Sequence, residues 1–165
     1  MATRLHYVKK AAKTYRGTGI KKGQPYYWYA FRYGPKIRSK SKPRRSALVR
    51  HEWDKFMLDL EDDVLALKVP DGTESVDVTE ISSQLSIYAD SVGDFKSELD
   101  ERVSNMESAF PNGCPTLEML TERVETLESL QQELDSAAND IEGEDGDTEE
   151  SIETINNTIE SINWS

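Results

Sequence analysis

Two long stretches of heptad-spaced apolar residues constrain the fold of this chain more than any other feature. Over residues 81–110 and 117–141, apolar side chains recur at steps of three and four residues, the spacing of a coiled-coil seam. Residues 111–115 (Pro-Asn-Gly-Cys-Pro) break the pattern, and Thr116 is the predicted N-cap of the second helix. So short a connection predicts an antiparallel helical hairpin. The seams comprise Ile81, Leu85, Tyr88, Val92, Phe95, Leu99, Val103, Met106 and Phe110, then Leu117, Leu120, Val124, Leu127, Leu130, Leu134, Ala138 and Ile141.

A third, short helix is predicted at the end of the chain. Asp147 and Glu150 have the spacing of a capping box, with Asp147 as the cap. Apolar residues then continue at helical steps: Ile152, Ile155, Ile159 and Ile162. A two-helix hairpin leaves its seam partly open, so either this helix or a second copy of the chain is expected to cover it.

The N-terminal part predicts a small β-hairpin followed by a helix. Residues 25–33 are dense in aromatic side chains that favour strands, Gly34-Pro35 predicts a turn, and residues 36–40 predict the returning strand. Alternation would place Tyr27, Tyr29, Phe31 and Tyr33 on one face, and Tyr26, Trp28, Ala30 and Arg32 on the other. Residues 1–24 are expected to form an exposed basic arm.

A helix over about residues 48–68 is expected to cover one face of the hairpin, since a two-stranded hairpin is marginal alone. Its apolar stripe comprises Trp53, Phe56, Met57, Leu60, Val64 and Leu67. The predicted fold class is therefore mainly α. We expect a head of hairpin plus helix over residues 1–68, a linker over 69–80 and an acidic helical part over 81–165.

Charge is divided unequally along the sequence. Residues 1–50 hold 15 basic residues and no acidic one, whereas residues 51–165 hold 5 basic and all 31 acidic residues. The net charge of −11 therefore describes neither part. A basic segment of this density repels itself unless a polyanion or the acidic part of the chain neutralises it. Nucleic acid is the partner that this pattern favours.

A nucleic-acid interface would use two kinds of side chain from the head. Lysines and arginines contact phosphates, and Tyr26, Trp28 or Tyr29 would stack on unpaired bases. The alternative is that these aromatic residues form only the small core of the hairpin. The predicted basic contacts are Lys21, Lys22, Arg32, Lys36, Arg38, Lys40, Lys42, Arg44 and Arg45, the last two beside the start of the predicted helix, where phosphate binding is favoured.

Several other classes of protein lack support in the sequence. A single cysteine, Cys114, excludes an internal disulfide, and two histidines, His6 and His51, do not suffice for the usual zinc or thiol sites. We therefore expect no enzyme, no metal and no cofactor. No apolar stretch approaches the ~20 residues that span a bilayer, and the first residues lack the apolar run of a secretory signal. We expect no membrane contact and a cytoplasmic location.

The head combines Lys21-Lys22-Gly23, the aromatic run ending in Phe31-Arg32, Ser39-Lys40 and Pro43-Arg44. Over residues 5–67 this pattern resembles small uncharacterised proteins encoded by tailed bacteriophages. The resemblance implies a viral origin, hence the cytoplasm of a bacterial host, and no established activity. The hairpin and helix are also similar to arm-type DNA-binding domains of tyrosine recombinases, which have three strands where two are predicted here.

Three functions are compatible with these features. In the first, the head binds DNA, RNA or a nucleoprotein, while the acidic helices form a homo-oligomer or recruit a host protein. In the second, the acidic coiled coil imitates a polyanion and inhibits a host defence or nucleic-acid enzyme. In the third, the chain is a structural or assembly protein of a virion. The acidic helices also have two simpler interpretations, as a solvated surface or as an internal partner of the basic head.

Overall fold

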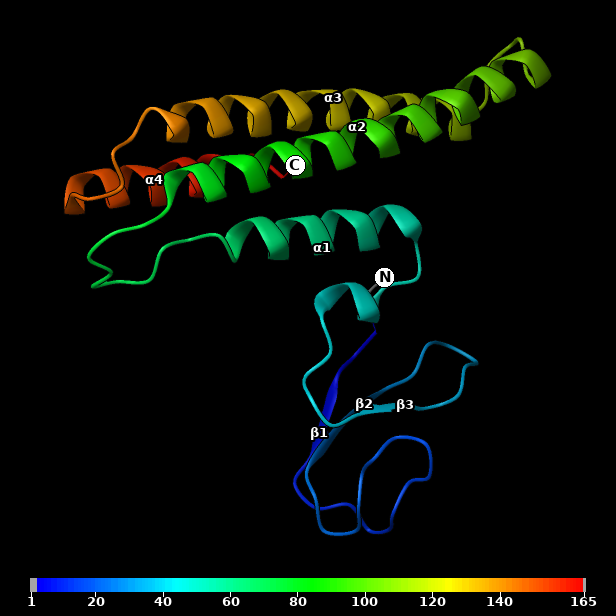
Figure 1. Ribbon diagram of the computed structural model, residues 1–165. Helices are drawn as coiled ribbons and strands as arrows, with labels where there is room; N and C mark the ends of the chain where they lie inside the picture. The colour runs from blue at the N-terminus through cyan, green and yellow to red at the C-terminus, as the bar shows by residue number, and fades with distance from the viewer. Residues whose placement is uncertain (1–2, 165) are drawn as a thin grey trace. The chain divides into compact units, whose positions relative to one another are not determined.

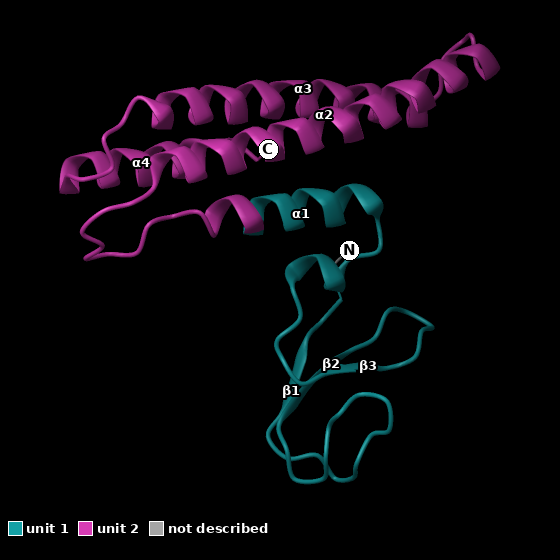
Figure 2. Ribbon diagram, in the orientation of Figure 1, with its two compact units in different colours: residues 1–62 teal, residues 63–165 magenta. Residues whose placement is uncertain are grey.

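The computed structural model describes residues 3–164 and is mainly helical, as predicted, with a small N-terminal sheet followed by long helices (Figure 1). The chain divides into two compact units, residues 1–62 and 63–165, which we call the basic unit and the acidic unit (Figure 2). The basic unit has 16 basic and 5 acidic residues, a net charge of +11. The acidic unit has 4 basic and 26 acidic residues, a net charge of −22. The division falls within helix α1 (Glu52–Leu65), and not in the predicted linker.

The sheet has three antiparallel strands in the order β1 (His6–Val8), β2 (Tyr26–Tyr29) and β3 (Ile37–Ser39). Trp28 in β2 lies opposite His6 in β1 and Arg38 in β3. The predicted hairpin is therefore present as β2 and β3, and β1 adds a third strand that was not predicted. A strand of three residues is too short to show a periodic pattern, and β1 forms only because β2 supplies its backbone partners.

Residues 9–25 form a folded loop and not an exposed arm. Ala11 donates its backbone N–H to the carbonyl of Gln24 at 2.8 Å and accepts from the N–H of Gly23 at 2.8 Å. Tyr15 and Ile20 form an isolated antiparallel bridge. Ala11, Ile20 and Tyr26 are buried together, with Val8, Tyr15 and Trp28 packed around them. The loop therefore supplies two of the three buried residues of this cluster.

The segment before α1 is more irregular than the sequence predicted. A short 3₁₀ helix spans Arg45–Leu48, and Val49 then adopts an extended backbone with φ −117° and ψ 159°. The carbonyl of Leu48 accepts from the N–H of Thr3 at 2.8 Å. Because this extended residue interrupts the helical hydrogen bonds, α1 begins at Glu52 and not at residue 48. The helix ends at Leu65, three residues before the predicted end.

The acidic unit is built on an antiparallel pair of helices, α2 (Val78–Ala109) and α3 (Pro115–Glu142) (Figure 1). Gly93 faces Gln131, and Lys96 Nζ lies 3.3 Å from Glu128 Oε2, so residue numbers rise along one helix as they fall along the other. The predicted hairpin is present. Its buried apolar positions are Ile81, Leu85, Ala89, Val92, Phe95 and Leu99 in α2, and Leu120, Leu127, Leu130, Leu134, Ala137, Ala138 and Ile141 in α3.

The end of this hairpin nearest the connecting loop is less covered. Beyond Leu99 no residue of α2 is buried: Val103 and Met106 are half-buried, and the side chain of Phe110 is 51% exposed. At the other end, α4 (Glu149–Ser161) packs against α3 and buries Ile155 and Ile159. The predicted third helix is therefore present. The heptad pattern of apolar residues in α2 continues to Phe110, whereas buried side chains end at Leu99.

Two predicted helix starts differ by one or two residues. Thr148, and not Asp147, caps α4, and its hydroxyl accepts from the N–H of Ser151 at 3.2 Å. The cap position of α3 is Cys114, with Pro115 as the first helical residue, instead of Thr116. Proline suits the first turn because its missing N–H would have no partner there.

Candidate nucleic-acid interface

The cations of the basic unit are held by aromatic rings. The described part of this unit contains five cation–π contacts, whereas proteins have about one in every 70–80 residues. The reason lies in the sequence, because residues 1–50 contain no carboxylate. The contacts join Lys13 and Arg38 to Tyr15, Arg32 to Tyr33, Lys36 to Trp28, and Arg50 to Phe31. A ring places a cation without neutralising it, so the positive charge stays available to an anion.

One face of the sheet gathers several of these groups. Trp28 and Arg38 are paired across β2 and β3, so their side chains share a face, and Lys36 and Lys40 directly flank β3. Lys36 Nζ lies 4.2 Å from the centre of the Trp28 ring, and His6 stacks on the same tryptophan at 4.1 Å with an interplanar angle of 7°. Trp28 is half-buried and already has ring partners. The structure therefore favours the core interpretation for Trp28 over base stacking.

Arg38 connects the sheet to the folded loop. Its guanidinium lies 4.3 Å from the centre of the Tyr15 ring, and the hydroxyls of Tyr15 and Tyr26 are 3.4 Å apart. The hydrogen bond with Tyr26, together with the charges of Arg38 and Lys13, lowers the pKa of Tyr15. Positive charge is thus concentrated where β3 meets the loop of residues 11–24.

The loop itself presents two of the predicted lysines. The N–H of Gln24 donates to the carbonyl of Lys21 at 3.1 Å, and the side-chain oxygen of Gln24 accepts from the N–H of Lys21 at 3.0 Å. This tight turn leaves the side chains of Lys21 and Lys22 exposed. A Cβ added at Gly19 would lie 3.6 Å from Lys40 Nζ, so Lys40 lies beside the same loop.

The structure places the twelve residues of the predicted interface in different environments. Eight of the nine basic residues are exposed, and Arg38 is half-buried. Tyr26 and Tyr29 are buried, at 7% and 8% exposure, and a ring so covered offers no face to a base. We therefore correct the stacking role predicted for these two tyrosines. Apart from Arg44 and Arg45, the exposed basic residues are Lys21, Lys22, Arg32, Lys36, Lys40 and Lys42.

Arg44 and Arg45 pair with carboxylates of α1. Arg45 donates from Nε and from a terminal nitrogen to one oxygen of Asp62, at 2.9 and 2.6 Å, and lies 3.0 Å from Glu61. Hydrogen bonding to Asp62 raises the pKa of the Arg45 guanidinium. A terminal nitrogen of Arg44 lies 3.6 Å from Asp59. These pairs join the Pro-Arg-Arg segment to the helix, so we leave both arginines out of the proposed interface.

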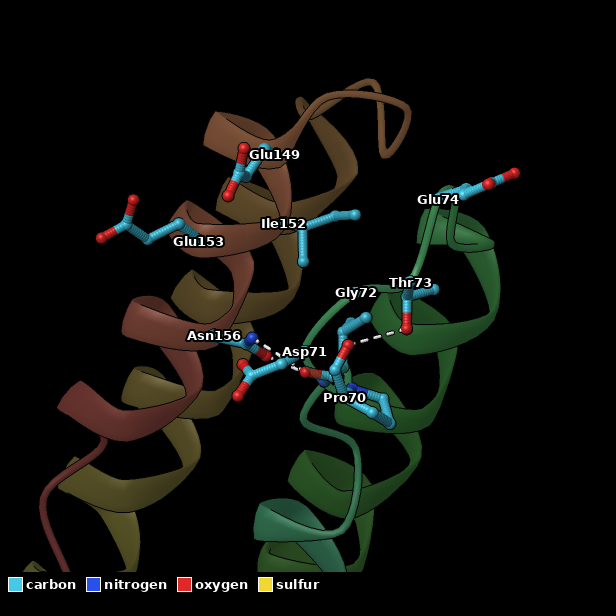
Figure 3. Close-up of a pocket in the computed structure, with 10 residues that line it drawn as sticks. Pro70, Asp71, Gly72, Thr73, Glu74, Glu149, Ile152, Glu153 and Asn156 are labelled. Atoms are coloured by element: carbon cyan, nitrogen blue, oxygen red, sulfur yellow. Dashed lines mark hydrogen bonds between the residues drawn. The ribbon is translucent and has the colours of Figure 1, made fainter.

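A cavity of about 780 Å³ lies in the acidic unit, between the loop after α1 and helix α4 (Figure 3). Four carboxylates belong to its lining, from Asp71, Glu74, Glu149 and Glu153. Such a surface repels phosphate. The candidate interface for nucleic acid therefore lies in the basic unit alone.

Sequence reasoning missed four contributors to this basic surface: His6, Lys13, Tyr15 and Arg50. His6, Tyr15 and Arg50 make ring contacts with residues that are distant in sequence or on another strand, and Lys13 lies 5.9 Å from the centre of the neighbouring Tyr15 ring. It also missed Tyr33, which it placed in a strand. In the structure β2 ends at Tyr29, and Tyr33 lies in the turn that follows. The available signal was Gly34-Pro35, which predicts a turn directly after Tyr33.

Within residues 3–164, no group of three or more His, Cys, Asp or Glu side chains is arranged to hold a metal ion, and no helix is long and apolar enough to cross a bilayer. Comparisons with protein-family models, curated proteins and solved structures find no match to this chain.

Proposed function

We propose that this protein binds nucleic acid, without catalysis, through the exposed cations of its basic unit. The observation that carries the proposal is the cluster of lysines and arginines that rests on aromatic rings and loop backbone with no carboxylate in residues 1–50. Such cations release counterions from phosphates on binding, which makes the affinity depend steeply on salt. The acidic unit would mediate oligomerisation or bind a partner protein.

The test compares two double variants of the full chain that remove the same charge. Lys21→Gln with Lys22→Gln alters the exposed loop, whereas Lys68→Gln with Lys96→Gln alters two lysines paired with Glu160 and Glu128 in the acidic unit. Binding to labelled single- and double-stranded DNA and RNA is measured across a salt series. The loop variant is expected to bind about 3- to 10-fold more weakly, with a salt slope reduced by about 0.9 for each lost phosphate contact.

The matched variant is expected to bind single strands and duplexes as the wild type does, within about twofold. Equal effects of the two double variants would show that only the net charge matters and would contradict the assignment of the interface. No binding of the wild type at low salt would overturn the proposal as a whole.

A second candidate function rests on the end of the helical hairpin. Phe110 and Met119 are 51% and 40% exposed there, among the carboxylates of a unit with a net charge of −22. An exposed apolar end with an acidic surround suits a contact with another chain, including the inhibited host enzyme of the polyanion hypothesis. If the contact is with a second copy, sedimentation velocity should show association of the wild type that Phe110→Ser reduces. A wild type that remains monomeric would exclude self-association at this end.

A further inference from the structure

The turn between β2 and β3 exposes an aromatic ring. The side chain of Tyr33 is 92% exposed, more than any other residue among the exposed large hydrophobic side chains in the described part of the chain. A ring in this position gains nothing from burial in the folded protein. Its placement therefore calls for an explanation outside the core.

The backbone of Tyr33 is also unusual. The N–H of Gly34 donates to the carbonyl of Phe31 at 2.8 Å, which closes a β-turn over residues 31–34 with Tyr33 in its third position. Tyr33 has φ 65°, and it is the one non-glycine residue with positive φ among residues 3–164. Turns of this kind favour glycine or asparagine at that position. The glycine lies one residue later, so the strained conformation falls on the aromatic residue instead.

Contacts with the rest of the basic unit hold this turn in place. A terminal nitrogen of Arg50 donates to the carbonyl of Arg32 at 3.1 Å, and the Arg50 guanidinium lies 4.9 Å from the centre of the Phe31 ring. Phe31 in turn meets buried Tyr29 edge to face at 5.8 Å. These contacts hold the backbone of the turn in place, so the position of the Tyr33 ring is fixed by the rest of the basic unit.

Arg32 supplies the charge beside the ring. Its guanidinium lies 5.0 Å from the centre of the Tyr33 ring. Since the ring is almost fully exposed, its other face is open to solvent. A planar ring with one free face and an adjacent guanidinium is the arrangement by which proteins stack a base and contact its phosphate together.

We infer that Tyr33, with Arg32, is the base-stacking element of this protein and that its substrate class is nucleic acid with unpaired bases. The inference rests on the proposed function and gives Tyr33 the role that the sequence predicted for Tyr26, Trp28 and Tyr29. In a duplex each base is already stacked on its neighbours, so the ring could reach a base face only by unstacking the helix. An unpaired strand offers base faces at no such cost.

The test uses the full chain and two single-stranded probes of equal length, about 20 nucleotides. One is oligothymidylate, and the other is an abasic strand that keeps the phosphates but lacks the bases. The variants are Tyr33→Phe, which keeps the ring, and Tyr33→Asn, which removes it. Asparagine tolerates positive φ better than most residues, so Tyr33→Asn is expected to unfold at a temperature no lower than the wild type.

The wild type and Tyr33→Phe are expected to bind oligothymidylate more tightly than the abasic strand, by about tenfold. Tyr33→Asn should lose most of this preference, while its affinity for the abasic strand and the salt slope stay unchanged. An undiminished preference in Tyr33→Asn would overturn the inference. So would equal binding of both probes by the wild type, although steep salt dependence would then still support the proposed function. Failure to bind either probe would overturn the inference, and the proposed function would fail with it only if the wild type also binds no duplex DNA or RNA at low salt.

Discussion

The side chain of Asn156 makes two hydrogen bonds with the backbone of Val69, although 87 residues separate them. Asn156 Oδ1 accepts from the Val69 N–H at 2.8 Å, and Nδ2 donates to the Val69 carbonyl at 3.0 Å (Figure 3). Val69 is buried, so without Asn156 its backbone N–H and carbonyl would have no water to serve as a hydrogen-bond partner. This pair ties the loop after α1 to helix α4 within the acidic unit.

Asn156→Ala is therefore expected to lower the free energy of unfolding by about 2 kcal/mol, because it leaves a buried N–H and carbonyl without partners. Urea unfolding followed by circular dichroism measures the change. Asn157→Ala is the control, because its side chain is exposed on the same helix, and it should cost less than about 0.5 kcal/mol. Similar losses in the two variants would mean that α4 responds to helix propensity alone.

Gly146 is expected to tolerate no side chain. Its φ is 71°, and an added Cβ would lie 2.6 Å from both the carbonyl oxygen of Val76 and a methyl carbon of Val78. Gly146→Ala should destabilise the protein by about 2–3 kcal/mol through backbone strain and overlap. Gly143→Ala, where φ is −78° and the nearest atom is 3.4 Å away, should be nearly neutral. Thermal unfolding of both variants measures the difference in stability. Equal stability of the two variants would show that the backbone around Gly146 can move to accommodate a Cβ, contrary to the prediction.

Asp145 is expected to give the acidic unit a pH-dependent contribution to stability. Its carboxylate accepts from the backbone N–H of Asp147 at 3.0 Å and, at 3.4 Å, from the Thr148 hydroxyl, and hydrogen bonding, first of all from Asp147, holds the pKa of Asp145 below its ordinary value of 3.8. A lowered folded-state pKa stabilises the protein above the unfolded pKa, and this stabilisation is lost as the pH falls through the folded value.

Asp145→Asn should accordingly be less stable than the wild type near neutral pH, and the difference should shrink as the pH falls below about 4. Urea unfolding at a series of pH values measures it. Asp71→Asn, in an exposed loop of the same unit, serves as the control and should show no such trend. A difference that stays constant with pH would assign the effect to the shape of the side chain and not to its charge.

Arg45 and Lys42 should separate stability from binding. Arg45→Met removes the contacts with Asp62 and Glu61, and should lower stability by about 0.3–1 kcal/mol at low salt and less at high salt, since all three side chains are partly exposed to solvent. Its affinity for nucleic acid should change by less than about twofold. Lys42→Met, at an exposed position of the same loop, should leave stability unchanged and weaken binding. Clearly weaker binding by Arg45→Met would show that Arg45 does contact nucleic acid, contrary to this prediction.

The helices were predictable because their signals repeat along the chain. Leu85, Val92 and Leu99 lie on one heptad seam and are buried as expected, and Pro111 to Pro115 contains the break that the hairpin requires. The same seam could not show where burial stops. Phe110 fits the pattern as well as Leu85 does, yet it is 51% exposed, because periodicity reports which side of a helix is apolar and not whether a partner covers it.

The candidate site was predictable in its charge but not in its geometry. The absence of acidic residues in residues 1–50 identified the basic surface. The sequence could not distinguish Arg45, which pairs with Asp62, from Lys42, since that distinction depends on the path of the chain into α1. Nor could it distinguish buried Tyr29 from exposed Tyr33, because both belong to one aromatic run.

The sequence by itself thus determined the helical hairpin, the third helix and the division of charge between the two parts of the chain. These features depend on patterns that recur over many neighbouring residues, so local physics suffices to specify them. Tertiary structure alone decided the pairing of β1 with β2, the partners of Arg45 and the left-handed backbone of Tyr33. Each of these depends on a few contacts between short or distant segments, and no local pattern records such contacts before the chain has folded.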